Sequence, residues 1–312
     1  MKRVILTGAT GFVGANLTRR LIEDGHEVHV LVRPSCHPWR LQPIQTELFW
    51  HEVNLSDQAA LIAVVERIKP DWIFHLAVHG AYSSQTDLTQ MVQTNFLGTI
   101  NLVEACLKVG FEAFVNTGSS SEYGFKATAP AETEWLEPNS HYAVTKASAT
   151  LFCRYTAQRQ KVHLPTLRLY SVYGPYEEPS RLMPTLIAQG LQGKLPPLVN
   201  PDIARDYVYV DDVNEAYILA ATRATPERGA VYNVGTGTQV RLREVVEVAC
   251  RVLGITAAPE WGSMPNRQWD SSVWIANNHK IQTELGWVPR YSFEQGFKSM
   301  TDWFQQHRPI SA

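Results

Sequence analysis

The sequence predicts an α/β protein: a doubly wound parallel sheet with a smaller lobe formed by later parts of the chain. Three observations support this fold class. Short apolar strands alternate with helical patterns through the first half of the 312 residues. A glycine-rich turn joins the first strand to the first helix, and the chain becomes rich in proline and glycine after Gly174. Short, nearly continuous apolar strands are what a parallel sheet covered on both faces requires.

The alternation gives the elements of the main domain in order. Each expected strand is a short apolar run, and the expected helices between them carry apolar residues at helical spacing. The expected strands are Arg3–Thr7, Glu27–Val32, Leu48–Val53, Trp72–Leu76, Ala113–Thr117 and Leu164–Leu169. The expected helices are Gly14–Glu23, Gln58–Ile68, Met91–Lys108 and Tyr142–Arg159.

The chain after Gly174 predicts a lobe whose segments leave the main sheet and return to it. The later elements are a helix at Met183–Gln192, a strand at Arg205–Val210, a helix at Val213–Ala221, a strand at Val231–Val234, and helices at Leu242–Leu253 and Phe293–His307. We expect residues 1–173 with about 205–240 to form the main domain, and about 174–204 with 241–312 to form the smaller C-terminal lobe.

The composition fits a folded protein without a polyanionic partner. The net charge is −2, with 45% hydrophobic and 19% charged residues, whereas binding to nucleic acid or to an anionic membrane favours basic clustering. No apolar segment approaches the roughly 20 residues of a membrane helix, and MKRVILTGAT does not have the pattern of a signal peptide. We expect a cytoplasmic protein with no nucleic-acid or membrane partner. The cysteines form no CxxC pair and the histidines lack metal-ligand spacing, so no metal site is predicted.

The turn TGATGFVGANL is the first functional signal. It places Gly8, Gly11 and Gly14 at G-x-x-G-x-x-G spacing between the first strand and the first helix. Glycine lets the backbone turn tightly and approach a pyrophosphate, whose charge then lies at the helix N-terminus. A plain glycine-rich turn is the alternative, but the position after the first strand of an alternating chain favours a dinucleotide site.

Two segments supply candidate catalytic side chains. In HYAVTKA, Tyr142 and Lys146 are four residues apart and share one face of a helix. An ammonium beside a phenol favours the phenolate, so we expect a lowered pKa for Tyr142 and a role in proton transfer. Upstream, NTGSSSEYG (116–124) follows a strand and offers a serine that can bond the same substrate oxygen. Taken alone, a Tyr/Lys pair at this spacing also occurs by chance.

In this order, the three features resemble the extended short-chain dehydrogenase/reductase family, in its nucleotide-sugar branch. The resemblance covers essentially the whole chain and includes PDWIFHLAV (70–78), TNFLGTINLVEAC (94–106), RLYSVYGP (168–175), RDYVYVDDV (205–213), YNVGTG (232–237) and ELGWVPR (284–290). It implies a Rossmann main domain that binds the dinucleotide and a lobe that binds a nucleotide sugar. It makes Tyr142 the catalytic acid/base, with Lys146 on the nicotinamide ribose and Ser119 on the reacting oxygen.

The resemblance also implies binding residues. Arg205 and Arg267 match the arginines that hold the nucleotide-sugar diphosphate, a task that suits forked guanidinium groups. An ion pair between Arg205 and Asp211 is the alternative. Further substrate-binding positions are His79, Ser120, Ser121 and Ser171. The cofactor-binding positions are Gly8, Thr10, Gly11, Phe12, Val13, Gly14, Arg33, Ser35, Asn54, Leu55, Leu76, Ala77, Val78, Tyr142 and Lys146.

The end of the second strand indicates which dinucleotide is preferred. NAD-preferring members of the family carry an acidic residue where this chain has Val32. Members that take NADP present basic and small polar residues just after it, similar to Arg33-Pro34-Ser35. A guanidinium pairs with a 2′-phosphate, whereas a carboxylate repels it. We expect NADP(H), with NAD as the alternative if Arg33 is only an exposed loop residue.

Two departures from the family pattern bear on the reaction. Dehydratases of the family carry a Glu two residues after the catalytic Ser/Thr, where this chain has Ser121. Dehydration is therefore disfavoured unless Glu122 reaches the site. Ser171 stands where many relatives carry an Asn that contacts the substrate, which leaves the sugar and the base open.

GSSSEYG is most similar to reductases of 4-keto-6-deoxy nucleotide sugars. We expect NADP(H)-dependent reduction at C4 of a nucleotide-linked hexose, with a 4-epimerase that holds NAD(P) tightly as the alternative. A non-catalytic dinucleotide-binding regulator would not need the intact Ser119, Tyr142 and Lys146. The helices expected at 91–108 and 142–159 carry apolar faces, and relatives pair through these helices, so a homodimer is predicted.

Overall fold

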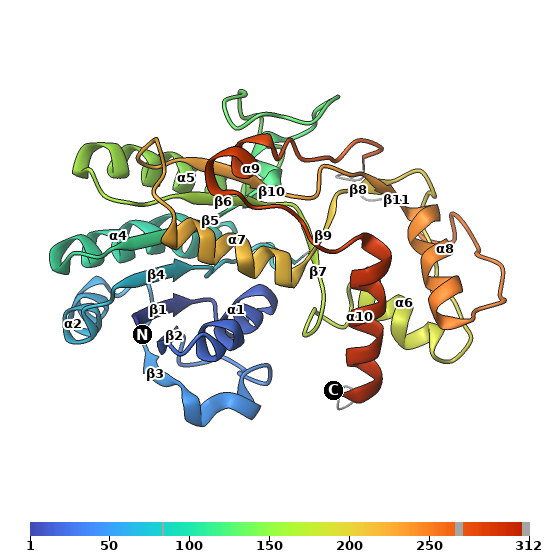
Figure 1. Ribbon diagram of the computed structural model, residues 1–312, viewed down its shortest axis with the longest axis horizontal. Helices are drawn as coiled ribbons and strands as arrows, with labels where there is room; N and C mark the ends of the chain where they lie inside the picture. The colour runs from blue at the N-terminus through green and yellow to red at the C-terminus, as the bar shows by residue number, and fades with distance from the viewer. Residues whose placement is uncertain (83, 266–270, 308–312) are drawn as a thin grey trace.

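The computed structural model describes residues 1–82, 84–265 and 271–307. Its centre is a seven-stranded sheet in the order β10-β6-β5-β4-β1-β2-β3, with every neighbouring pair parallel (Figure 1). The strands are β1 (Arg3–Thr7), β2 (Glu27–Val32), β3 (Phe49–Glu52), β4 (Trp72–His75), β5 (Ala113–Ser119), β6 (Thr166–Leu169) and β10 (Val231–Val234). The winding reverses between β1 and β4, and ligands of such sheets bind outside the carboxyl ends of the strands at this reversal.

Helices cover both faces of the sheet, so the predicted doubly wound parallel sheet is confirmed. Alternate residues of β1 serve the two faces: Val4 and Leu6 are buried with α1, α7 and α9, whereas Ile5 is buried with α2, α4 and α5. The helices on the first face are α1 (Phe12–Glu23), α7 (Val210–Thr222) and α9 (His279–Leu285). The helices on the second face are α2 (Gln58–Ile68), α4 (Gly98–Val109) and α5 (His141–Gln160).

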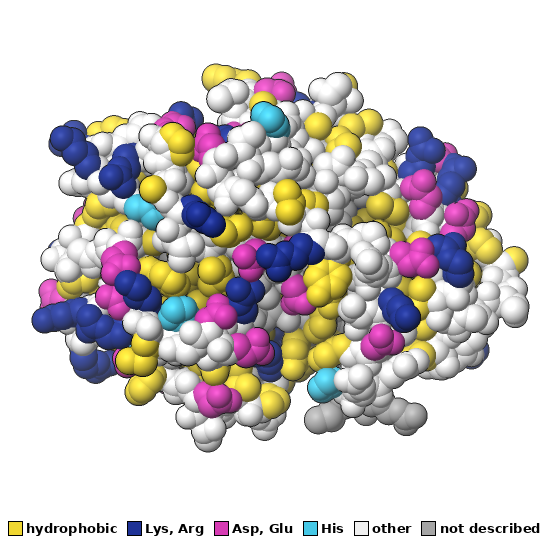
Figure 2. Space-filling model, viewed as in Figure 1, with side chains coloured by type: hydrophobic (Ala, Val, Ile, Leu, Met, Phe, Trp, Pro, Cys, Tyr) yellow, Lys and Arg dark blue, Asp and Glu magenta, His cyan; other side chains and the backbone are white. Residues whose placement is uncertain are grey.

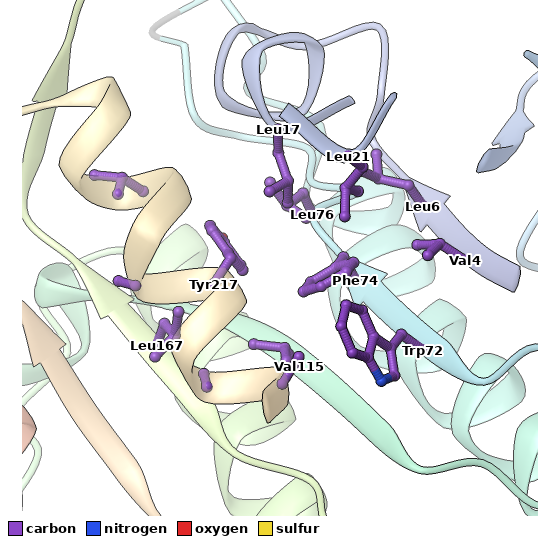
Figure 3. Close-up of a cluster of buried hydrophobic side chains, with 14 of the residues drawn as sticks. Val4, Leu6, Leu17, Leu21, Trp72, Phe74, Leu76, Val115, Leu167 and Tyr217 are labelled. Carbon is purple, nitrogen blue, oxygen red and sulfur yellow. The ribbon is translucent and has the colours of Figure 1, made fainter. Parts of the chain in front are cut away.

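Aromatic contacts join the first face to its helices. Figure 3 shows Phe74 of β4 facing Tyr217 of α7, with Leu17 and Leu21 of α1 on the same face of the sheet. The rings of Phe74 and Tyr217 meet edge-on at 6.0 Å between centroids, an arrangement that aromatic quadrupoles favour. The buried Tyr217 hydroxyl is paired with Thr117 Oγ1 of β5 at 2.6 Å. Helix α7 is thereby fixed over the strands that end at the site.

A third hydrophobic cluster lies beside the sheet, on the right of Figure 1. It joins α6 (Leu182–Gly190), α8 (Leu242–Leu253) and α10 (Phe293–Gln306) to the small parallel pair β7 (Ser171–Tyr173) and β9 (Tyr207–Tyr209). A second pair, β8 (Ala204–Arg205) with β11 (Val240–Arg241), is antiparallel. Packing is close, because a Cβ at Gly296 of α10 would lie 2.2 Å from the Tyr173 hydroxyl.

The observed elements follow the predicted ones, with differences that have local causes. The helix expected at Met91–Lys108 is α3 (Leu88–Met91), a π-helical turn η2 (Val92–Leu97) and α4. The strand expected at Arg205–Val210 is divided into β8 and β9 at Asp206, whose buried carboxylate accepts hydrogen bonds from residues 236, 237 and 276. Short elements β7, β11, α9 and the 3-10 turns η1 (Gln42–Glu47) and η3 (Ser120–Tyr123) were not expected.

The described surface carries interspersed charges. On the face drawn in Figure 2, Lys and Arg side chains lie among Asp and Glu rather than in one basic field. Within the described ranges, no helix is both long enough and apolar enough to cross a bilayer. The same residues contain no group of three or more His, Cys, Asp or Glu side chains arranged to hold a metal.

Candidate active site

The glycine turn lies at the carboxyl end of β1, where the winding reverses. Gly8 has a φ of +73°, and a Cβ there would lie 2.5 Å from the Leu76 carbonyl carbon. A Cβ at Gly14 would lie 2.2 Å from the Gly8 oxygen. The Gly11 N–H donates to the Gly8 carbonyl at 3.0 Å and closes the turn. Only glycine fits at Gly8 and Gly14, so β1, α1 and the loop after β4 approach one another as a dinucleotide turn requires.

Helix α1 begins directly after this turn. Gly11 is its N-cap and provides no side-chain cap, so the amides of Phe12, Val13 and Gly14 have no earlier carbonyl within the helix. Thr10 and these residues are half-buried or buried at the end of the sheet. Free amides at a helix N-terminus bind anions such as a pyrophosphate. The turn therefore fits a dinucleotide.

The loop after β2 carries the residues expected at a 2′-phosphate. Arg33 and Ser35 are exposed, and the Cys36 N–H donates to the Arg33 carbonyl at 3.0 Å, which turns the chain. The pKa of His79 is lowered by burial first and then by the positive charge of Arg33. Arg33, on the loop after β2, thus acts electrostatically across the glycine turn on the loop after β4.

The other expected cofactor positions line the neighbouring strand ends. The Leu76 N–H donates to the Thr7 carbonyl at 3.1 Å, and the Ala77 N–H donates to Thr7 Oγ1 at 3.2 Å. Val78 is exposed, as is Asn54, whose side chain accepts from the Ser56 N–H at 3.1 Å. Leu55 is buried, and its carbonyl accepts from Asn101 Nδ2 at 2.8 Å.

Asn95, in the π-helical turn η2, is a residue that the sequence reasoning missed. Its fully buried side chain accepts from the His79 N–H at 2.8 Å and donates to the His79 carbonyl at 2.8 Å. It also donates to Thr145 Oγ1 of α5 at 2.9 Å. Asn95 therefore ties the loop after β4 to the helix that carries Tyr142 and Lys146. Asn95 lies within the matching stretch TNFLGTINLVEAC (94–106), but the π-helical turn that directs its side chain to the loop after β4 is not visible in apolar periodicity.

Ser119, Tyr142 and Lys146 are brought together, as the motifs suggested. Ser119 ends β5 and caps the 3-10 turn η3, where its Oγ accepts from the Ser121 N–H at 3.2 Å. Tyr142 lies in the first turn of α5, which is capped by Ser140, and its side chain lies close enough to that of Ser119 to interact with it. Lys146 follows one turn later and is buried, with 3% of its surface exposed.

The expected lowering of the Tyr142 pKa is wrong. The pKa of Tyr142 is raised overall. Burial is the largest cause and the charge of Glu122 adds to it, whereas the contact with Ser119 and the charge of Arg181 act in the opposite direction. The pKa of Lys146 is lowered, first by burial, although Glu122 opposes the change. Desolvation disfavours both charged forms. In this environment Tyr142 is a protonated phenol, which suits a proton donor.

Ser120, Ser121 and Glu122 follow Ser119 in η3. Ser120 is buried and Ser121 is half-buried. Glu122 is fully buried and bonds the Ser119 N–H, Thr150 Oγ1 and Arg168 Nε at 2.8, 3.0 and 2.8 Å. These bonds occupy both carboxylate oxygens. Glu122 therefore does not replace the acid/base Glu that dehydratases of the family carry at the position of Ser121.

Of the expected substrate residues, Ser171 and Arg205 lie in the short strands β7 and β8, outside the main sheet. Ser171 is half-buried in β7. The Arg205 guanidinium lies 5.3 Å from the centroid of the Trp274 ring. Burial raises the pKa of Asp211, and the cation that opposes this rise is Arg20 rather than Arg205. Arg267 lies outside the described residues.

Arg181, the N-cap of α6, is a second residue that the sequence analysis missed. Its charge lowers the pKa of Tyr142, and its guanidinium donates to the Ala81 carbonyl at 3.2 Å.

Comparisons with known proteins agree with this geometry. The NAD dependent epimerase/dehydratase family matches residues 4–235. A dTDP-glucose 4,6-dehydratase of Escherichia coli is 27% identical, with 98% of this chain and 94% of the relative covered. The structure of a Thermus thermophilus UDP-glucose 4-epimerase in complex with NAD is 28% identical with a TM-score of 0.84, covering 99% of this chain and 100% of that one.

A longer plant protein is similar at the same level. It is a trifunctional UDP-glucose 4,6-dehydratase/UDP-4-keto-6-deoxy-D-glucose 3,5-epimerase/UDP-4-keto-L-rhamnose-reductase of Arabidopsis thaliana, 27% identical over 98% of this chain. The chain spans about half the length of that relative, 47%.

Proposed function

The chain belongs to the NAD dependent epimerase/dehydratase family, and from this premise we propose that it is an NADP(H)-dependent oxidoreductase acting at C4 of a nucleotide-linked hexose. The reaction we propose is reduction of a 4-keto-6-deoxy nucleotide sugar. The observation that carries the proposal is the cluster of Ser119, Tyr142 and Lys146 at the carboxyl end of the sheet, with Tyr142 close to Ser119.

The roles of the residues follow from their positions. A bound nicotinamide dinucleotide supplies the hydride. The Ser119 hydroxyl polarises the keto oxygen, and Tyr142 donates a proton to that oxygen, a contribution of about 10²–10⁴-fold for a positioned acid. The buried Lys146 ammonium stabilises the phenolate left behind and holds the nicotinamide ribose. Asn95 holds the loop after β4 against α5, which fixes the position of Tyr142 relative to the dinucleotide site.

The dinucleotide preference rests on Arg33. Its side chain is exposed at the end of β2, and no carboxylate occupies the position of Val32. An exposed guanidinium at this edge can pair with a 2′-phosphate, which favours NADP(H). The alternative is NAD, because the family is described as NAD dependent and the Thermus thermophilus neighbour is a complex with NAD.

The choice of reduction over dehydration rests on η3. Dehydration needs a carboxylate next to the keto group, and this chain has Ser121 at that position. Glu122 is held by Ser119, Thr150 and Arg168. A raised pKa for Tyr142 suits a residue that begins the reaction protonated.

The substrate side is proposed from charge and position. We assign the diphosphate to Arg205 and Arg267, and the sugar to Ser120, Ser121, Ser171 and His79. The Trp274 ring lies beside Arg205, within the range of a cation–π contact. We assign residues 1–173 with about 205–240 to dinucleotide binding and about 174–204 with 241–312 to the nucleotide sugar. Strand β10 joins the main sheet, in line with this division, whereas β7 and β9 belong to the first range and pair with each other outside the main sheet.

The assembly we propose is a homodimer. Helix α5 exposes Val144, Leu151 and Tyr155 by 47%, 57% and 61%, and Leu97 beside it in η2 is 44% exposed. An apolar strip of this kind is typical of an interface. All four cysteines are free thiols, which fits the cytoplasm as the compartment.

One panel of substrates tests the function. The protein is incubated with NADPH or NADH and with nucleotide sugars or their 4-keto-6-deoxy forms, and the product mass and the cofactor absorbance are followed. Oxidation of added NADPH with a keto sugar supports the reductase. Loss of water from a nucleotide hexose, or no turnover of any keto sugar, overturns it.

A 4-epimerase is the second candidate. The Thermus thermophilus UDP-glucose 4-epimerase shares the fold across the whole chain. The same three residues could move the proton of the C4 oxygen in both directions, while a tightly held dinucleotide would take up the C4 hydride and return it. Activity on a nucleotide hexose without added cofactor, together with dinucleotide that copurifies with the protein, identifies the epimerase.

A further inference from the structure

A buried ion pair lies directly behind the proposed catalytic serine. Glu122 of η3 is fully buried, and its Oε2 accepts from Arg168 Nε of β6 at 2.8 Å. The Arg168 side chain is 3% exposed. Two charges are rarely taken out of water unless each has a partner and further hydrogen bonds. The pair therefore constrains its surroundings strongly, and the proposed reaction does not use it for proton transfer.

The other carboxylate oxygen connects the two halves of the site. Glu122 Oε1 accepts from the Ser119 backbone N–H at 2.8 Å and from Thr150 Oγ1 at 3.0 Å. Thr150 lies on α5, four residues after Lys146, so the two share a helix face. One side chain thus holds the backbone of Ser119 against the helix that carries Tyr142 and Lys146.

The carboxylate has little freedom to move. A Cβ at Gly118 would lie 2.7 Å from Oε1, so the strand passes close to it. The Arg168 guanidinium lies 4.5 Å from the Tyr123 ring centroid and donates to the Tyr123 hydroxyl at 2.7 Å. That hydroxyl donates to Asn233 Oδ1 of β10 at 2.8 Å. The network therefore ties Glu122 to β6 and β10 as well as to α5.

We propose that Glu122 is a positioning residue of this site, which fixes Ser119 against α5 and presents a negative charge to Lys146 and Tyr142. The proposal deepens the proposed function and rests on it for the role of these two residues. Glu122 holds no substrate atom and carries no proton in the reaction. Its effect is exerted through the residues that do.

The charges around the pair give the direction of its effect. Lys146 faces Glu122, Cys153 of its own helix and His75 of β4; burial lowers the pKa of Lys146 and Glu122 opposes this. Tyr142 faces Ser119, Glu122 and Arg181; burial raises its pKa and Glu122 raises it further. Neutralising Glu122 therefore makes both groups lose their protons at lower pH.

The test compares Glu122→Gln with Glu132→Gln. Glu132 belongs to the same network, because its carboxylate accepts from the Asn233 N–H at 2.9 Å and its carbonyl accepts from Arg168 at 3.4 Å. These bonds join Glu132 to β10 and to Arg168 rather than to Ser119 or α5. The pH dependence of kcat/KM for keto-sugar reduction is measured for both variants.

We expect the alkaline limb to move to lower pH in Glu122→Gln, by on the order of one pH unit, the scale of a nearby charge. Glu132→Gln should keep the wild-type profile. We also expect kcat to fall while the KM for the dinucleotide stays within about twofold, since no cofactor contact is lost. An unchanged profile and kcat in Glu122→Gln overturn the proposal.

A double variant separates positioning from folding. Glu122→Gln leaves Arg168 buried without a counter-charge, which destabilises the fold. Glu122→Gln with Arg168→Met removes both charges, and its melting temperature should recover towards wild type. The shifted pH profile should persist in this folded double variant, and a return to the wild-type profile overturns the role of the charge.

Hydrogen exchange provides a readout that does not need turnover. The Ser119 amide should exchange at least about tenfold faster in Glu122→Gln, the equivalent of one weakened hydrogen bond, while the β1 amides stay protected. Unchanged exchange at Ser119 overturns the positioning role. If the wild-type protein turns over no keto sugar, the proposed function fails, and the exchange result still decides whether Glu122 holds Ser119.

Discussion

Tyr142 and Ser119 lie close enough for their side chains to interact across the junction between β5 and α5, and this contact with Ser119 opposes the rise that burial causes in the pKa of Tyr142. The two residues are separated by the long segment 124–140, which protrudes from the sheet end in Figure 1. Local sequence spacing therefore could not predict that the two side chains lie side by side. In the proposed reaction, this is the point at which a substrate oxygen would receive its proton.

The first prediction concerns this donor. Tyr142→Phe removes the hydroxyl and should reduce kcat by at least about 100-fold, the scale of a lost general acid. Dinucleotide affinity should stay nearly intact in fluorescence titration. Tyr155→Phe is the control, because that tyrosine lies on the same helix with 61% of its surface exposed. Near-normal turnover by Tyr142→Phe would remove this residue from the mechanism.

The second prediction concerns the cofactor preference. Arg33→Ala should weaken NADPH binding about ten- to a hundred-fold, because a charge-assisted contact contributes about 1.5–3 kcal/mol. NADH binding should barely change, and added salt should reduce the preference of the wild type. Arg223→Ala, an exposed arginine at the end of α7, should change neither affinity. Equal binding of NADH and NADPH by the wild type would contradict the assignment.

The third prediction concerns the glycine turn. Gly8 and Gly25 both have left-handed φ values, +73° and +76°, but only at Gly8 would a Cβ meet neighbouring backbone, at 2.5 Å. Gly25→Ala should cost about 1–2 kcal/mol of unfolding free energy from backbone strain alone. Gly8→Ala adds the collision and should cost about 3 kcal/mol or more. Urea denaturation and NADPH titration check this, and equal costs would mean that the close approach is absent.

The fourth prediction concerns assembly. Leu151→Asp puts a charge in the centre of the exposed apolar strip of α5 and should convert a homodimer into a monomer at micromolar concentration, measured by light scattering. Leu191→Asp changes a leucine of comparable exposure, 46%, after α6 and should leave the mass unchanged. A monomeric wild type would rule out the strip as the interface.

The fifth prediction concerns stability at acid pH. Burial lowers the pKa of His75 to about 3, and its ring nitrogens bond Thr7 and Thr99 at 2.7 and 2.9 Å. His75 is therefore protonated below about pH 6.5 in the unfolded chain, whereas in the folded protein its ring stays neutral down to about pH 3. Stability from this group is present above pH 6.5 and falls by about 1.4 kcal/mol per pH unit below it.

The comparison for this prediction is the slope of unfolding free energy against pH between about pH 6 and pH 4, a window inside the two pKa values. His75→Gln should flatten the slope relative to wild type. His37→Gln, at an exposed position, should leave it unchanged. Parallel slopes for His75→Gln and the wild type would show that the ring is protonated in the fold.

Much of the main sheet was predictable because short parallel strands and their covering helices leave a local pattern. The ranges of β1, β2, β10, α2 and α8 coincide with those expected. The elements that were missed depend on distant partners. Asp206 divides an apparently continuous strand because its carboxylate is used by Thr236 and Ala276, far along the chain.

The same distinction holds for the candidate site: residues with a local motif could be predicted, and pairings between distant residues could not. Gly8, Tyr142 and Lys146 could be found because their spacing is itself the signal. The upward direction of the Tyr142 pKa shift could not be predicted, because it depends on how far folding removes the phenol from water. The pairing of Glu122 with Arg168 joins residues 46 positions apart and needs the register of β5 with β6.

The loop after β7 has a consequence for how freely its sequence can change. Asn16 of α1 donates to the Pro175 carbonyl at 2.9 Å, and the buried Arg40 donates to the Tyr176 carbonyl at 2.7 Å and the Thr10 carbonyl at 3.3 Å. All three acceptors are main-chain oxygens, which most side-chain substitutions leave in place. Arg40 also pairs with one loop side chain, Glu178, at 3.1 Å. Tolerance to mutation is therefore uneven: apart from Glu178, most loop side chains can change while these bonds to the loop persist, whereas replacing Asn16 or Arg40 removes them.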